Sequence, residues 1–219
     1  MRHLKFAGLT LAAAVASCAI MASAAAAKSA LVLRDPSGVI PAGTTITAAS
    51  TNLTSVTAAG NMECENSVLP AVLQGNDLSK LKLTSTEAHF FGDYLGIEGA
   101  CRTSADGPAL IEAEGLGWSN ELTTSGVSTL KGTKKVAYTA TFLGLEGPND
   151  RCAYEASKVQ SHFRAGAAGK PEALEFTTTN QPFKLEKKAP DTAPICSPEL
   201  KISANWNVED ANGQVQVEQ

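Results

Sequence analysis

Four cysteines and two tryptophans constrain this chain more than any other feature. They follow the same order twice: Cys64, Cys101 and Trp118, then Cys152, Cys196 and Trp206. The first cysteines of the two sets are 88 residues apart, and so are the two tryptophans. The triplet Ser37-Gly38-Val39 recurs at this offset as Ser125-Gly126-Val127. Self-similarity at a fixed period indicates duplication, so the spacing predicts two tandem modules, residues 28–122 and residues 123–219.

The N-terminus has the pattern of a signal peptide. Arg2 and Lys5 precede an uncharged apolar run over residues 6–20, and Ala22-Ser23-Ala24 matches a cleavage site. The run is shorter than the ~20 residues of a membrane span, so we expect no transmembrane segment. Residues 1–27 are therefore predicted to be a signal peptide, which places the protein outside the cell or in the cell envelope. As an alternative, Val15-Ala16-Ser17-Cys18 resembles a lipobox, which would make the protein a lipoprotein anchored through Cys18.

The remaining cysteines predict disulfides. Four cysteines stay with the exported chain, an even number in an oxidising compartment. Pairing within each module, Cys64 with Cys101 and Cys152 with Cys196, fits the duplication best among the three connectivities. A zinc site is the alternative, but the chain has neither a CxxC motif nor a nearby histidine pair. We therefore expect no metal site and no cofactor.

Short alternating segments predict an all-β fold. Leu200, Ile202, Ala204, Trp206 and Val208 alternate with polar residues, and residues 136–142 show the same period of two. Residues 109–118 are expected to form a closing strand with bulges at Gly115 and Gly117, and residues 179–182 a hairpin turn. Many short strands separated by glycine turns favour antiparallel β-sandwich or barrel-like modules.

The charge balance argues against nucleic-acid binding. Of the 18 basic residues, Arg2 and Lys5 leave with the signal peptide, so 16 basic residues face 22 acidic ones and the formal charge becomes −6. A chain without a basic patch has little to hold phosphates. We expect a partner outside the cell or in the envelope, either protein or polysaccharide.

Few residues suggest catalysis. Glu112 and Glu114 share one face of a predicted strand, as do Glu63 and Glu65, and such pairs could act as acid and base on a sugar. The exported chain keeps two histidines, His89 and His162, which fall off the 88-residue period. No Gly-x-Ser-x-Gly motif is present. We therefore assign no catalytic, cofactor-binding or metal-binding residue.

Three segments carry a resemblance to a known group. They are residues 43–64, residues 131–136 and residues 179–185, with sequences rich in glycine, threonine and asparagine turns. Together they resemble a group of secreted, uncharacterised all-β proteins of actinobacteria, over most of the exported chain. The resemblance implies an exported all-β protein, and it supplies no activity and no catalytic residue.

These observations favour a secreted or envelope-associated protein that is not an enzyme and has a structural, adhesive or binding role. The alternative is a secreted carbohydrate-active hydrolase that uses a surface carboxylate pair such as Glu112 and Glu114. A third class, a carrier of small molecules, would need an apolar cavity between the sheets. Aromatic residues make up 5% of the chain, which gives no sign of such a cavity.

Overall fold

The computed structural model describes residues 30–57, 60–76, 78–104, 107–144, 149–190, 193 and 195–219. All the regular secondary structure assigned in these residues is β-strand, and the named strands pair antiparallel. This confirms the all-β prediction. The predicted signal peptide, including Cys18, lies outside the described residues. Within these residues there is no helix long and apolar enough to cross a membrane.

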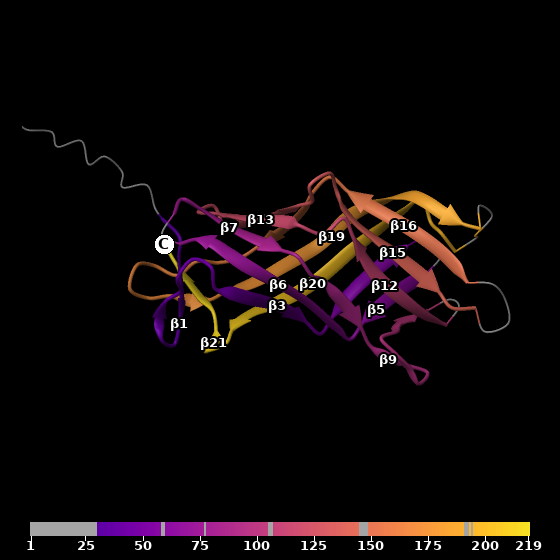
Figure 1. Cartoon of the computed structure of the whole chain (residues 1–219), viewed down its shortest axis with the longest axis horizontal. Coiled ribbons are helices and arrows are strands. Elements are labelled where there is room, and N and C mark those ends of the chain that lie inside the picture. The colour runs from indigo at the N-terminus through magenta and orange to yellow at the C-terminus, as the bar shows by residue number, and fades with distance from the viewer. Residues whose placement is uncertain are drawn as a thin grey trace, which may run out of the picture.

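Two long strands organise the molecule. β19 (Glu175–Ala189) and β20 (Glu199–Asp210) pair with each other and run side by side through the middle of an elongated shape (Figure 1). In β20 the buried Leu200, Ala204 and Val208 alternate with exposed residues such as Lys201 and Asn205. This alternation is the predicted one, and it forms because successive side chains of a strand point to opposite faces.

A bulge divides β19 into two parts with different alternation. The pairing of Thr178 with Ala204 is followed by that of Gln181 with Ile202, so β19 holds one extra residue there. Asn180 adopts a left-handed backbone with φ 47° at this point. The extra residue moves the inward side from even to odd positions, and Phe176, Thr178 and Phe183 are all buried. The predicted hairpin turn at residues 179–182 is therefore wrong, because the chain bulges there and continues in the same direction.

The first of two closed rings of strands, called ring 1, surrounds one half of this pair. Going round from β20, each strand pairs with the next until β19 returns to β20: β3 (Thr45–Ser50), β6 (Asn66–Gly75), β7 (Lys80–Ser85), β13 (Trp118–Thr123), β14 (Val127–Lys131) and β17 (Val159–His162). Ring 1 thus has eight strands. At this number of strands the interior of a closed sheet either fills with side chains or holds one small ligand.

The second ring, called ring 2, surrounds the other half. From β20 it passes through β4 (Leu53–Thr57), β5 (Gly60–Cys64), β11 (Cys101–Thr103), β12 (Pro108–Glu114), β15 (Val136–Phe142) and β16 (Asp150–Ala156) back to β19. The strand β8 (His89–Phe91) pairs with β6 of ring 1 and with β12 of ring 2, and so connects the rings a second time. A small hairpin, β9 (Asp93–Tyr94) and β10 (Ile97–Glu98), projects beside ring 2 (Figure 1).

A small sheet covers the far end of ring 1. It contains β18 (Glu172–Ala173), β22 (Gln216–Glu218), β1 (Val32–Asp35) and β2 (Gly38–Val39), and β21 (Gly213–Gln214) folds back on β20 beside it. Leu33 and Val217 from this sheet belong to the same buried cluster as Leu73 and Leu122 of ring 1. The sheet therefore closes the interior of ring 1 at that end.

The chain alternates between the two rings as it proceeds. β12 lies in ring 2 and β13 in ring 1, and Gly115 and Gly117, with φ 61° and 95°, form the crossing between them. The predicted closing strand over residues 109–118 is therefore two strands, and the glycines mark a turn rather than bulges. The predicted module boundary after residue 122 falls within β13, and each predicted module supplies strands to both rings. The two copies of the 88-residue repeat do not form two separate sheets. The duplication therefore stays a prediction from sequence.

Candidate functional site

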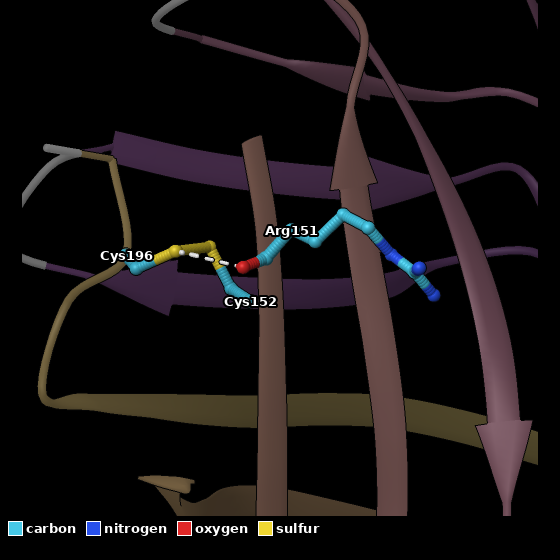
Figure 2. The surroundings of a disulfide bond; sticks show 3 residues. All are labelled: Arg151, Cys152 and Cys196. Atoms are coloured by element: carbon cyan, nitrogen blue, oxygen red, sulfur yellow. Dashed lines mark hydrogen bonds between the residues drawn. A yellow bond between two sulfur atoms is a disulfide. The ribbon is translucent and has the colours of Figure 1, made fainter. Parts of the chain in front are cut away.

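Both disulfides lie in ring 2. Cys64 on β5 is bonded to Cys101 on β11, and Cys152 on β16 is bonded to Cys196 in the connection between β19 and β20. These are the pairs favoured from the sequence. Figure 2 shows the second bond, with Sγ of Cys196 3.4 Å from the carbonyl oxygen of Arg151 and the side chain of Arg151 directed away. All four cysteines are buried in two core clusters, so they act as structural links rather than as a redox site.

The candidate acid pair lies on the surface. Glu112 and Glu114 are exposed on β12, and the hydroxyl of Thr139 donates a hydrogen bond to the carboxylate of Glu114. They border an open groove together with His89 and Phe91, which belong to β8. Acid–base carboxylates depend on burial to hold a proton near neutral pH. Glu112 and Glu114 have no such burial, so the pair has the placement of solvated surface acids.

The other candidates from the sequence, two glutamates and two histidines, also do not come together. Glu63 and Glu65 are exposed on either side of Cys64. His89 on β8 has Nε2 3.5 Å from a carboxylate oxygen of Glu87, whereas His162 lies on β17, which is not a neighbour of β8. Among the described residues, no group of three or more His, Cys, Asp or Glu side chains could hold a metal ion.

The two tryptophans lead to a different site. Trp118 at the start of β13 is 2% exposed, and Trp206 on β20 is partly buried between two core clusters. Both line one cavity of about 110 Å³ in the interior. The tryptophans that sequence spacing assigned to two separate modules therefore share one interior.

Every strand of ring 1 contributes to the wall of this cavity. Ring 1 supplies Ile46, Ala48, Leu69, Ala71, Leu83, Ser85, Trp118, Asn120, Ser128, Leu130, Val159, Ser161, Phe176, Thr178, Phe183, Ile202, Trp206 and Val208, and Leu53, Phe90, Val136 and Tyr138 complete the lining. None of these side chains carries a charge at neutral pH. The cavity exists because several inward positions hold small residues, such as Ala48, Ala71 and Ser85, which leave space that larger side chains would fill.

One wall of the cavity carries a stripe of polar groups. The hydroxyl of Ser128 donates to Oδ1 of Asn120 at 2.7 Å, and the hydroxyls of Ser161 and Thr178 lie 2.7 Å apart. The indole N–H of Trp206 donates to Oγ1 of Thr178 at 3.2 Å. These groups pair with one another inside the ring, as buried polar groups do. The stripe therefore runs across β13, β14, β17, β19 and β20, while the residues of β3 and β6 that line the cavity are apolar.

Tyr138 lines the cavity on the side of ring 2, and Tyr154 lies next to Tyr138. The ring of Tyr138 packs at a tilt of 60° against that of Phe183, with centroids 5.2 Å apart, and at a tilt of 32° against that of Tyr154, with centroids 5.7 Å apart. Burial raises the pKa of Tyr138 well above its usual value, an effect that the nearby Ser55 hydroxyl partly offsets. Burial also raises the pKa of Tyr154 to about 12. Both phenols therefore stay neutral at physiological pH, and the interior stays uncharged.

Sequence reasoning missed this cavity. The aromatic content of the whole chain is low, but Phe90, Trp118, Tyr138, Phe176, Phe183 and Trp206 gather around one space. A usable signal was the presence of small residues at the inward positions of alternating strands. Comparison of the chain with protein-family models, with curated proteins and with solved structures finds no match. The geometry of the interior is thus what indicates function.

Proposed function

We propose that this chain is an exported, non-catalytic binding protein that holds a small, compact apolar molecule inside ring 1. The observation that carries the proposal is the apolar cavity of about 110 Å³, to which every strand of ring 1 contributes. Of the structural, adhesive and binding roles that the composition allows, binding is the one for which the interior provides a specific site.

The size and chemistry of the cavity set the kind of molecule. An apolar protein cavity of about 150 Å³ stays dry and takes up benzene. A cavity of about 110 Å³ with a mostly hydrocarbon lining is suited to a molecule of similar or slightly smaller size. Water in such a space lacks the two to four polar partners that it needs at most positions. An apolar guest instead gains dispersion contacts with a wall that otherwise lacks neighbours.

Benzene is a suitable probe of this proposal. Benzene at millimolar concentration should raise the melting temperature of the protein from which residues 1–27 have been removed, since a ligand that binds only the folded state stabilises it by mass action. The double variant Ala48→Leu, Ala71→Leu should abolish the shift, because both alanines line the cavity and leucine fills it. Ala49→Leu is the matched control, because Ala49 is exposed on the opposite face of β3.

Two results would contradict the proposal. One is the absence of any shift for the unmodified sequence. The other is an equal shift for the filled double variant, which would place benzene elsewhere.

Export is the second part of the proposal. It rests on the signal pattern in residues 1–27 and on two disulfides, which persist in oxidising compartments. N-terminal sequencing and intact mass of the protein recovered from an expressing bacterium should show cleavage near Ala24 or Ala27. A mature N-terminus at a lipid-modified Cys18 would instead show an anchored lipoprotein, and an intact Met1 inside the cell would contradict export.

A further inference from the structure

Ring 1 is weakly closed at one contact between neighbouring strands. Within the described chain, β17 and β19 are joined by a single residue pair, His162 with Thr177. Every other neighbouring pair of strands in ring 1 is joined by three residue pairs or more. The extra residue of β19 between Thr178 and Gln181 lies next to this contact, and a bulge disrupts the ladder around it. We call the contact of β17 with β19 the seam.

Beyond its one residue pair, the seam is held by side chains. The backbone N–H of Gln160 donates to Oε1 of Gln181 at 2.9 Å, and the hydroxyls of Ser161 and Thr178 lie 2.7 Å apart. Oε1 of Gln181 thus takes the place that a backbone carbonyl has in a regular ladder. When the strands part, water replaces such partners, so the net cost of each broken hydrogen bond is small.

The seam separates the cavity from an open groove on the outer surface. Val159, Ser161 and Thr178 line the cavity, whereas His162 and Thr177 line the groove. Successive side chains of a strand point to opposite faces. The cavity and the groove therefore lie on the two faces of the same seam, and parting β17 from β19 would connect them.

The two ends of ring 1 are closed more firmly. At the far end, Leu33 of the small sheet is part of the core, and Asn76 ties the backbone of Leu33 and Ile40 to ring 1. At the other end, Tyr138 packs against Phe183 and the interior continues into ring 2. A guest that left by either end would have to displace packed core residues. Passage through the seam breaks one backbone pair and two hydrogen bonds that involve side chains.

From this arrangement we propose that the guest enters and leaves ring 1 through the seam, and that the hydrogen bond from Gln160 to Gln181 controls how often the seam opens. The inference rests on the proposed binding function and adds the route and its control. Gln181 is not among the described residues that line the cavity. It therefore acts on the rates of association and dissociation equally and leaves the affinity unchanged.

The test uses fluorobenzene with the signal-free protein, and fluorine NMR exchange measurements give both rate constants. Gln181→Ala should raise both rate constants about fivefold and leave the dissociation constant within about twofold, because the loss of one hydrogen bond shifts the opening equilibrium by this order. Gln181→Glu keeps an acceptor oxygen for Gln160, so both rate constants should stay within about twofold of the native values.

Gln74→Ala is the matched control. Gln74 is exposed on β6, on the opposite side of ring 1, and its side chain donates to the carbonyl of Val72 on the same strand. This substitution removes the same side chain without touching the seam, so it should leave both rate constants unchanged.

A measurement on the native sequence needs no substitution. Hydrogen exchange reports local opening, and the amide proton of Gln160 should exchange at least about tenfold faster than the slowest amides of β13, which is paired along its length on both sides. Equal protection of the two strands would overturn the seam as the point of opening.

The outcomes separate the two proposals. If fluorobenzene does not bind, the binding function itself is overturned. If it binds but Gln181→Ala leaves both rate constants unchanged, or Gln74→Ala raises them equally, the seam is not the route and the cavity still stands as a binding site. A dissociation constant that changes while the association rate constant does not would show that Gln181 acts on the bound guest, and would also overturn the inference.

Discussion

The indole nitrogen of Trp206 lies 3.2 Å from Oγ1 of Thr178, across the two longest strands of the molecule. The ring of Trp206 also packs against the core clusters of both rings. This contact joins the polar stripe of ring 1 to the pair of strands that the two rings share. The interior of the molecule is therefore continuous where β19 and β20 pass from one ring to the other.

Trp206→Ala should lower the free energy of unfolding by about 3–5 kcal/mol, because it removes a large side chain from this junction. Urea denaturation of the signal-free protein measures the change. Phe91→Ala is the control, since Phe91 is 38% exposed and should cost about 1 kcal/mol or less. A near-neutral effect of Trp206→Ala would contradict the packing described for this residue.

Asn76 holds the end sheet to ring 1. Its Oδ1 accepts from the backbone N–H of Leu33 at 2.8 Å, and its Nδ2 donates to the carbonyls of Leu33 and Ile40, each at 2.8 Å. Asn76→Ala should cost about 2–3 kcal/mol in urea denaturation because three partly buried hydrogen bonds are lost. Asn205→Ala, at an exposed position of β20, should change stability by no more than about 0.5 kcal/mol. Equal effects of the two substitutions would show that Asn76 does not hold the sheet.

The disulfides should stabilise the molecule by restricting the unfolded chain. Their sequence separations are 37 and 44 residues, and loops of this length correspond to about 4 kcal/mol each in the chain-entropy account. Because both bonds lie in ring 2, Cys152→Ala with Cys196→Ala should raise amide hydrogen exchange in β15 and β16 before it does so in β7 and β13. An increase in hydrogen exchange that begins in the strands of ring 1 would contradict this prediction. Thiol titration in denaturant should find no free thiol in the signal-free protein.

Glu218 should make the free energy of unfolding depend on pH in the acidic range. A hydrogen bond from Arg34, followed by one from the backbone of Gly169, lowers the pKa of Glu218 below its ordinary value of 4.5. A carboxyl with a lower pKa in the folded state stabilises that state above the unfolded pKa, and this stabilisation is lost as the pH falls through the folded value. The stability difference between the native sequence and Glu218→Gln should therefore shrink as the pH falls below 4.5.

Urea midpoints measured at a series of pH values check this prediction. Glu209→Gln, at an exposed position of β20, is the matched control and should show a difference that does not change in that range. A difference for Glu218→Gln that is the same at about pH 6 and about pH 3 would contradict the assigned role of the ion pair.

The strands could be predicted wherever alternation is clean. Leu200 to Val208 formed the clearest pattern, and they lie in β20, because one face of that strand is buried and the other meets solvent. The bulge of β19 could not be predicted in the same way. Asn180 and Pro182 favour turns as strongly as bulges, and the choice depends on whether β20 lies beside the whole segment.

The cavity could not be predicted because it depends on strands that are distant in sequence. Ala48 and Ser161 are ordinary small residues by themselves, and they leave space only because ring closure brings β3 and β17 around one interior. The acid pair failed as a guide for the opposite reason. Glu112 and Glu114 share a face, as their spacing requires, but that face of β12 meets solvent.

The central claim is that ring 1 encloses an apolar cavity able to admit a guest, and a crystal structure of the signal-free protein under xenon pressure tests it most directly. Xenon enters dry apolar cavities of this size without needing polar contacts. The account predicts a xenon peak among Ala71, Phe176 and Trp206, lost in the Ala48→Leu, Ala71→Leu variant. An interior that holds no xenon, because side chains fill it, would contradict the account.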